Sequence, residues 1–325
     1  MTTAGDMKID LGLLERAAEV VHAVMPPTPQ YNWPLLSARA GCEVWAKHEN
    51  HTPVGAFKIR GGLVYMDDLK RGTNPPSGVI TATRGNHGQS IAFSATRAGL
   101  KSIVVVPEGN SVEKNAAMIA LGAELVVHGH DFQAAFEYAQ ARAAEEHLHM
   151  VNSFHPLLVA GVGTYGLELF RAAPDLEAVF VPIGLGSGIC GVMAARDAVG
   201  STAEIYGVVA EGAPAYALSY EAGQPVSTNE ALTMADGVAC RVPVPGAFAQ
   251  IKAGASGVIR VSDDEIKAAM RHLFTDTHNV IEGAGAASLA ALLKAKQKWA
   301  GRKVGVILSG GNVDADMYRA VLAEG

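Results

Sequence analysis

The sequence has few aromatic and few charged side chains. Phe, Trp and Tyr make up 6% of the 325 residues, and Asp, Glu, Lys and Arg make up 18%, whereas hydrophobic residues reach 49%. This supply of apolar residues is ample for a core, and it excludes a wholly disordered chain. The 36 glycines and 15 prolines follow no period, which excludes collagen-like and low-complexity chains. The length favours one large domain or two modest ones.

Basic residues and long apolar runs are lacking too. The 26 Lys and Arg residues are outnumbered by 32 Asp and Glu residues, so the net charge is −6. Nucleic acids and anionic membranes attract proteins with a surplus of basic side chains, so we expect neither as a partner. No run of about 18 apolar residues could span a bilayer. The first residues lack the basic end and apolar stretch of a secretion signal.

Cysteine is rare. The three cysteines, Cys42, Cys190 and Cys240, are an odd number, lie far apart and form no Cys-x-x-Cys pair. A disulfide framework is therefore not expected, and a reducing compartment fits best. We expect a cytoplasmic protein.

Short, β-branched, apolar segments alternate with helical patterns along most of the chain. Strands that are apolar throughout are typical of a parallel sheet covered by helices on both faces. The repeats predict an α/β fold with mainly parallel sheets, in which ligands bind beyond the carboxyl ends of the strands. The predicted strands are Gly78–Thr83, Ser102–Val106, Glu124–His128, Met150–Ser153, Ala178–Ile183, Glu204–Ala210, Gly257–Val261 and Lys303–Leu308.

Two segments between these strands carry helix-start signals. Ser262-Asp-Asp-Glu265 has the pattern of a capping box, because a hydroxyl precedes a carboxylate by three residues. Asn110-Ser-Val-Glu113 is a weaker version of the same pattern. Each predicts that a helix begins directly after it.

Two breaks suggest how the chain divides. Lys70–Ser77 is a polar, proline-rich connector, and a second break falls near Asn152–Pro156. We expect a small α/β domain over residues 76–153. It is inserted into a large, discontinuous domain formed by residues 1–75 and 154–325.

The segment Val181–Gly191 places four glycines between a strand and a helix. Glycines let the backbone approach a ligand closely, and the free N–H groups that open a helix attract an anion such as phosphate. A plain tight turn is the simpler interpretation. Within the segment, Gly186–Gly191 also matches the dinucleotide-binding pattern Gly-x-Gly-x-x-Gly, with the acidic Glu211 about 20 residues further on. That pattern taken alone predicts a nicotinamide-dependent oxidoreductase.

Three further segments place polar residues at the ends of apolar runs. Lys58 opens a helix inside the apolar stretch of His48–Gly61, and desolvation would lower its pKa and make the amine a better nucleophile toward an aldehyde. An isolated lysine that reaches out from a helix end is the commoner case. Thr81–Gln89 forms a polar turn whose N–H groups can hold a carboxylate. Val306–Asp314 places the hydroxyl of Ser309 at the end of a buried strand, where it can meet a heteroatom or simply bond nearby backbone.

In this order and spacing, the four segments resemble the fold type II pyridoxal-phosphate enzymes, specifically the serine/threonine dehydratase and serine racemase branch. The resemblance covers essentially the whole chain, and it implies a tryptophan synthase β-like fold. That fold has two open, mainly parallel α/β domains with the active site in the cleft between them. The segments that carry the resemblance are Phe57–Gly61, Thr83–Gln89, Gly184–Gly188, Thr233–Val238, Val280–Gly283 and Ser309–Asn312.

The resemblance implies a role for each of these residues. Lys58 would hold pyridoxal 5'-phosphate covalently, Asn86 would bond its ring 3-hydroxyl, and Ser309 would face the pyridine nitrogen. The phosphate would lie on the loop of Gly184, Leu185, Gly186, Ser187 and Gly188. The substrate carboxylate would be held by the turn of Thr83, Arg84, Gly85, Asn86 and His87.

The implied activity is that of an ammonia-lyase, in which Lys58 removes the α-proton. A β-hydroxy-α-amino acid such as threonine, serine, 3-phenylserine or 3-hydroxyaspartate would lose water and yield a 2-oxo acid and ammonia. A neutral Ser309 does not compel protonation of the pyridine nitrogen, so elimination suits it better than a long-lived carbanion. A racemase or a β-replacement enzyme is the alternative within the fold. A nicotinamide-dependent oxidoreductase and a non-catalytic small-anion-binding protein are the alternatives outside it.

The sequence departs from the resemblance at three places. Racemases of this branch carry a second serine where Arg84 stands, and arginine is a poor proton shuttle. Glu211 matches one ligand of the racemase cation site, but Ala215 and Ala217 follow it, so a divalent or monovalent cation is left open. Ser187 replaces a glycine of the phosphate loop.

The choice of amino acid is open from the sequence. Phe132 and Phe154 would favour an apolar β-substituent if both lined the cleft, as in threonine or 3-phenylserine. Arg84 would instead favour an acidic substrate such as 3-hydroxyaspartate if it pointed inward. The resemblance also implies a homo-oligomer.

Overall fold

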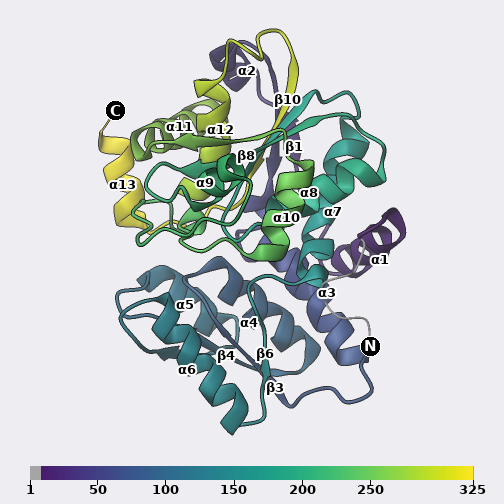
Figure 1. The fold of residues 1–325 in the computed structure, drawn as a ribbon, viewed down its shortest axis with the longest axis vertical. Helices are drawn as coiled ribbons and strands as arrows, with labels where there is room; N and C mark the ends of the chain where they lie inside the picture. Colours follow the sequence, from purple (N-terminus) through teal and green to yellow (C-terminus); the bar gives the residue numbers. More distant parts are fainter. Residues whose placement is uncertain (1–8, 325) are drawn as a thin grey trace.

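Residues 9–324 are described by a computed structural model, in which the strands form two sheets (Figure 1). The larger sheet has the order β1-β2-β10-β7-β8-β9, and its strands run parallel except that β1 pairs with β2 antiparallel. Its strands are β1 Gln30–Asn32, β2 Glu43–His48, β7 Ala178–Pro182, β8 Glu204–Ala210, β9 Gly257–Val261 and β10 Lys303–Leu308.

The smaller sheet has the order β5-β4-β3-β6, and all its pairs are parallel. Its strands are β3 Gly78–Ala82, β4 Lys101–Val106, β5 Glu124–Val127 and β6 His149–Met150. All four lie between residues 78 and 150, which supports the predicted small domain. The domain boundaries themselves stay a prediction, and the first eight residues of the predicted large domain lie outside the described residues.

Helices cover both faces of the larger sheet, and the strands show why. Along β7, Ala178 and Phe180 pack into one apolar cluster, whereas Val179 and Val181 pack into a second cluster on the other face. The first cluster includes residues of α11 and α12, and the second includes residues of α7 and α8. The helices are α1 Leu11–His22, α2 Pro34–Ala40, α3 Lys58–Arg71, α4 Asn86–Ala98, α5 Val112–Ala120, α6 Phe132–Glu145, α7 Pro156–Ala172, α8 Ser187–Ala198, α9 Ala215–Ala222, α10 Pro245–Gly254, α11 Asp263–Thr277, α12 Gly283–Lys294 and α13 Ala315–Ala323, with short 3₁₀ turns η1 Glu49–His51 and η2 Asp236–Val238.

The eight predicted strands are all present; seven lie within one residue of their expected bounds, whereas β6 ends at Met150, three residues before the expected end at Ser153. The strands β1 and β2 were not predicted. β2 carries Lys47 and His48, and both side chains are buried. The Lys47 ammonium donates hydrogen bonds to Thr28 O at 2.9 Å and to Glu168 Oε2 at 2.6 Å. Buried charged residues interrupt the hydrophobic pattern by which a strand is predicted from the sequence. Their burial is not evident from the sequence, because the partners that neutralise them are distant along the chain.

Helix starts agree with one of the two predicted caps. At α11, Ser262 Oγ accepts from Glu265 N and the Glu265 carboxylate accepts from Ser262 N, which completes a capping box. The helix predicted at the weaker box is present as α5, but its cap is Ser111 and not Asn110, and the Ser111 hydroxyl accepts from Lys114 N. The Glu113 carboxylate accepts instead from Ala315 N, the first residue of α13.

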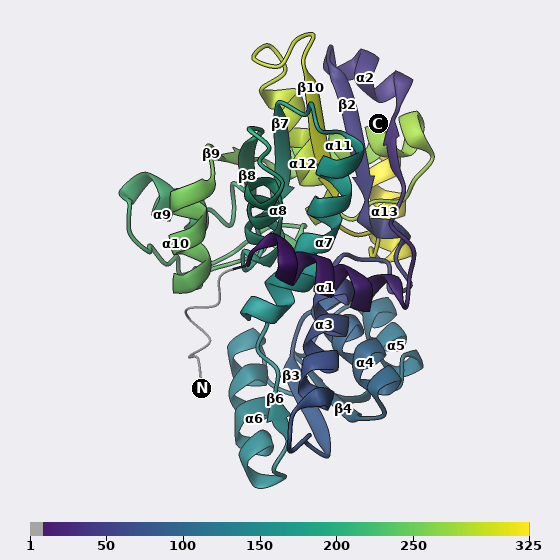
Figure 2. The same cartoon turned by 90° about the vertical axis from the view of Figure 1, so that its right-hand side faces the viewer.

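Helix α3 lies between the two sheets, packed against α4 and α7 (Figure 2). Its start is fixed to the larger sheet, because Phe57 N donates a hydrogen bond of 3.0 Å to Ser309 O at the end of β10. A Cβ at Gly161 of α7 would lie 2.4 Å from Arg60 O, so a glycine is required where α7 crosses α3. Among the helices within residues 9–324, none is both long and apolar enough to cross a membrane.

Candidate active site

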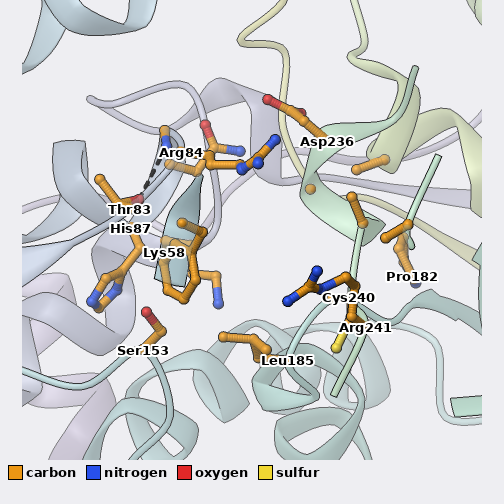
Figure 3. Close-up of a pocket in the computed structure, with 18 of the residues that line it drawn as sticks. Lys58, Thr83, Arg84, His87, Ser153, Pro182, Leu185, Asp236, Cys240 and Arg241 are labelled. Atoms are coloured by element: carbon orange, nitrogen blue, oxygen red, sulfur yellow. Dashed lines mark hydrogen bonds between the residues drawn. The ribbon is translucent and has the colours of Figure 1, made fainter. Parts of the chain in front are cut away.

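A cavity of about 510 Å³ opens between the two sheets at the carboxyl ends of β3, β7 and β10 (Figure 3). The structure brings the four predicted segments together on its lining, although they span 250 residues of sequence. The predicted site residues on the lining are Lys58, Thr83, Arg84, Gly85, Asn86, His87, Phe132, Gly184, Leu185, Gly186, Ser187, Gly188 and Ser309. This placement agrees with the rule that parallel sheets bind ligands beyond their carboxyl ends.

Lys58 is the first residue of α3, and its amine points into the cavity (Figure 3). Nζ donates a hydrogen bond of 2.9 Å to Ser187 Oγ and lies 5.0 Å from the centre of the Phe57 ring. No carboxylate of residues 9–324 lies within 4 Å of this amine, so burial is not offset by an ion pair. Burial therefore lowers the pKa of Lys58 to about 8. The structure thus provides an amine whose neutral, nucleophilic fraction near neutral pH is far larger than that of an ordinary lysine.

The loop from Gly184 to Gly188 joins β7 to the start of α8. Gly186 has a φ of +98°, which L side chains rarely adopt, and a Cβ at Gly184 would lie 2.4 Å from the backbone oxygen of Gly237. The loop therefore requires glycine at both positions. It brings the unbonded N–H groups of the first turn of α8 to the cavity, which is the arrangement that binds phosphate.

A threonine side chain fixes the conformation of the turn after β3. Thr83 Oγ1 accepts from Gly85 N at 3.0 Å and from Gly88 N at 3.3 Å. This fixes the backbone where α4 begins, so its first N–H groups face the cavity. His87 is buried beside them, and burial together with the charge of Lys58 lowers its pKa to about 3. His87 is therefore neutral at physiological pH, and its Nε2 has no hydrogen-bond partner within the described part of the chain.

Besides Asp131 and Glu230, four charged residues on the lining were not predicted as site residues. Glu282 is buried at the N-cap of α12, and burial raises its pKa to about 7. Its Oε1 accepts a bond of 2.7 Å from Asn86 Nδ2. Lys114 donates to Asp236 Oδ2 at 2.5 Å and lies 4.0 Å from Glu282 Oε2. Arg241, in the loop before α10, is the fourth. The sequence segments around Asp236 and Glu282 had been noted only for their resemblance.

Two candidate residues lie away from the cavity lining. Phe154 is absent from the cavity lining, because it packs on the apolar cluster of α7, α8 and α10 while its neighbour Ser153 faces the cavity. Glu211 also lies off the lining; it is exposed and pairs with Lys294 at 3.2 Å. Residues 9–324 contain no group of three or more His, Cys, Asp or Glu side chains placed to hold a metal ion.

The fold and the site together define an α/β enzyme that holds an anionic cofactor beside a reactive lysine. A family model described as "Pyridoxal-phosphate dependent enzyme" matches residues 23–310. The chain belongs to this family, and within it to the fold type II serine/threonine dehydratase group, so the fold and cofactor expected from the sequence are confirmed.

Three similar proteins support this assignment. The L-threonine ammonia-lyase of Geobacter sulfurreducens is 37% identical over 291 residues, which cover 89% of this chain and 72% of the relative. The structure of processed threonine deaminase isoform 2 from Solanum lycopersicum matches with a TM-score of 0.88 at 30% identity, over 97% of this chain and 94% of that one. Maize serine racemase matches with a TM-score of 0.90 at 26% identity, over 98% of both chains.

The residues of the cavity fit pyridoxal phosphate on their own chemistry. The glycine loop and the start of α8 suit its phosphate, and Lys58 offers the amine that its aldehyde requires. Asn86 and Ser309 place an amide and a hydroxyl on the same lining. A hydroxyl such as that of Ser309 does not compel protonation of a pyridine nitrogen, as a carboxylate partner would.

Proposed function

We propose that this chain eliminates water from a β-hydroxy-α-amino acid and releases a 2-oxo acid and ammonia. The α-C–H and β-C–O bonds break, water leaves, and the enamine that forms is hydrolysed by a second water. The observation that carries the proposal is the buried Lys58 amine, which faces the cavity next to the phosphate-binding loop. Threonine and serine are the simplest members of this substrate class.

Lys58 acts as the general base on the α-proton in this proposal. A pKa of about 8 leaves a substantial neutral fraction at neutral pH, and a positioned base contributes roughly 10²–10⁴-fold to a rate. When bound, pyridoxal phosphate supplies the conjugated ring that accepts the electrons left on the α-carbon. Ser187, which accepts the Lys58 hydrogen bond at 2.9 Å, positions the amine between the loop and the substrate.

The turn from Thr83 to His87 binds the α-carboxylate. Its backbone N–H groups are ordered by Thr83 Oγ1, and a helix N-terminus favours an anion. A neutral His87 adds a hydrogen-bonding group without a competing charge. Asn86 is held on both sides, by Glu282 and by Asn312 Nδ2 at 2.9 Å, and is thereby oriented toward the cofactor.

Elimination suits the site better than racemisation. A racemase needs an acid/base group on the face opposite Lys58, and Arg84 stands where the racemases of this branch carry serine. A guanidinium remains protonated and cannot relay that proton. Ser309, a neutral partner for the ring nitrogen, also favours prompt loss of the β-hydroxyl.

The test is product formation by the holoenzyme and by a matched pair of lysine variants. Wild-type protein given L-threonine or L-serine should release ammonia and 2-oxo acid in equal amounts. Lys58→Ala should lose at least about 10³-fold in turnover, whereas Lys70→Ala, exposed on the same helix, should not change. Borohydride reduction should leave the cofactor mass on the Lys58 peptide. Racemisation without ammonia, or a fully active Lys58→Ala, would overturn the proposal.

We also propose a cytoplasmic homo-oligomer. Cys42, Cys190 and Cys240 are buried thiols without disulfide partners, which fits a reducing compartment. Size-exclusion chromatography with light scattering measures the assembly state directly. A mass equal to that of one chain would contradict the oligomer.

A further inference from the structure

Two arginines on the cavity lining have no role in the proposed elimination. The glycine loop is assigned to the cofactor phosphate, and the Thr83–His87 turn to the α-carboxylate. Two guanidinium groups remain on the lining, those of Arg84 and Arg241. Figure 3 shows Arg241 projecting into the cavity from the side opposite Lys58, and Arg84 extending toward the side where Asp236 lies.

Most N–H donors of the Arg241 guanidinium form no hydrogen bond within residues 9–324. Its hydrogen bond within residues 9–324 runs from Nη1 to Asn229 O at 3.1 Å, and no carboxylate there lies within 4 Å of its guanidinium. The planar fork of arginine matches a carboxylate with two parallel N–H···O bonds, which a lysine cannot reproduce. Arg241 is exposed to solvent on the lining, so water meets these donors until a ligand that carries a carboxylate replaces it.

The acidic residues on the lining do not neutralise Arg241. Asp236 is paired with Lys114, and Glu282 is bonded to Asn86. Asp131 caps α6 by accepting from Ala134 N at 2.9 Å; that N–H lowers its pKa most, and the charge of Arg241 adds only a smaller effect. Glu230 is exposed and has no cationic partner within 4 Å in the described chain.

We propose that Arg241 binds a carboxylate on the β-carbon side of the substrate, so that the substrate class is the β-hydroxy dicarboxylic amino acids. 3-Hydroxyaspartate is the smallest member. This inference rests on the proposed elimination and specifies its substrate. Loss of the α-proton and the β-hydroxyl as water, followed by hydrolysis of the enamine, converts 3-hydroxyaspartate to oxaloacetate and ammonium. No oxidant or further co-reactant is required.

An aryl substituent is the competing occupant. Phe132 and Leu185 supply an apolar wall, and a ring could lie over the guanidinium for about 0.5–2 kcal/mol. A ring offers the N–H donors of Arg241 no acceptor in place of the water that it displaces, whereas a carboxylate accepts from two of them. A charged hydrogen bond of this kind contributes about 1.5–3 kcal/mol, which corresponds to roughly 10- to 100-fold in affinity.

The first experiment compares kcat/KM for ammonia release from 3-hydroxyaspartate, L-threonine and 3-phenylserine. Wild-type holoenzyme should prefer 3-hydroxyaspartate. Arg241→Gln should lose about 10- to 100-fold on 3-hydroxyaspartate and change less than about threefold on threonine. The control Arg319→Gln removes an exposed arginine on α13 and should leave all three substrates unchanged. Preference for threonine or 3-phenylserine, or an equal loss on every substrate, would overturn the inference.

A second experiment needs no turnover and so separates this inference from the proposed function. Succinate and butyrate have the same carbon chain, but only succinate carries two carboxylates. Succinate should raise the Tm of wild-type holoenzyme more than butyrate does, because a ligand bound to the folded state stabilises it, and Arg241→Gln should remove the difference. Equal shifts in the wild type would overturn the inference. If no β-hydroxy amino acid releases ammonia, the proposed function fails, while the succinate result still tests Arg241 as an anion site.

Discussion

Asn86 and Glu282 meet across the cavity through a hydrogen bond of 2.7 Å, from Nδ2 to Oε1. Asn86 opens α4, which packs on the smaller sheet, and Glu282 is the N-cap of α12, which packs on the larger one. The bond therefore joins the two halves of the molecule at the site. The second oxygen of Glu282 is buried and has no hydrogen bond within residues 9–324.

Glu282 should make stability fall as the pH rises toward neutrality. Its pKa in the folded protein is about 7, above the ordinary value of 4.5, so the folded state binds more protons than the unfolded state between these values. The free energy of unfolding should then decrease through this window, by up to about 1.4 kcal/mol per pH unit, and level off above pH 7. Urea unfolding of wild type and Glu282→Gln from pH 5 to 8 measures this contribution as their difference.

The control for that measurement is Glu19→Gln, an exposed carboxylate on α1. The difference between wild type and this control should not change with pH near neutrality. The free energy of unfolding of the wild type, relative to that of Glu282→Gln, should decrease as the pH rises. A constant difference across the range would mean that Glu282 is already ionised in the folded protein at pH 5.

The rate at which Lys58 reacts with the cofactor should depend on pH, because burial lowers the pKa of its amine. Only the neutral amine attacks an aldehyde, and its pKa is lowered to about 8. The second-order rate of uptake by protein freed of cofactor should rise about tenfold per pH unit below this value and then level off. Stopped-flow absorbance measures the rate. A rise that continues to pH 10 would indicate an amine with an ordinary pKa.

The sequence was sufficient to predict those elements and residues that a pattern of neighbouring residues identifies. Strands such as β7 are apolar on both faces, and Gly186 requires glycine for a local reason, its positive φ. These features predicted eight strands and the four segments that meet on the lining.

The missed residues depend on partners that only the fold supplies. Lys47 on β2 is buried because Glu168 lies beside it, 121 residues later. Lys114, Asp236 and Glu282 come from three separate elements and meet only in the cavity. Phe154 lies next to a residue of the lining but does not line the cavity itself. The neighbouring Ser153 faces the cavity, whereas the side chain of Phe154 packs on the apolar core.

Gly184→Ala should weaken cofactor binding. The new Cβ would lie 2.4 Å from Gly237 O, a backbone atom that cannot move without shifting the loop. Such overpacking costs about 1–3 kcal/mol, so the Kd for pyridoxal phosphate should rise about tenfold or more. Absorbance titration measures it. Gly246→Ala is the control, because its Cβ would have no neighbour nearer than 3.9 Å. An unchanged Kd for Gly184→Ala would show that the loop tolerates a side chain.

Arg60 should be one of the strongest contributors to stability outside the cavity. Its guanidinium is fully buried and donates to Glu49 Oε2 at 2.7 Å and to Glu168 Oε1 at 2.6 Å. Burial alone would raise the pKa of Glu168, but the charges of Arg60 and Lys47 lower it to about 2. Removing the cation leaves two buried carboxylates with reduced compensation.

Arg60→Met should therefore lower the free energy of unfolding by about 3–5 kcal/mol, the usual cost of breaking a buried ion pair from one side. Adding Glu49→Gln should restore part of that loss, because it removes the buried charge of Glu49, whereas Glu168 keeps its ion pair with Lys47. Arg319→Gln, which breaks an exposed pair with Asp316, should change stability by less than about 1 kcal/mol. Urea unfolding at pH 7 measures all three. A loss for Arg60→Met as small as that of Arg319→Gln would mean that Glu49 and Glu168 become protonated or hydrated without cost, and that α3 is held by its apolar packing alone.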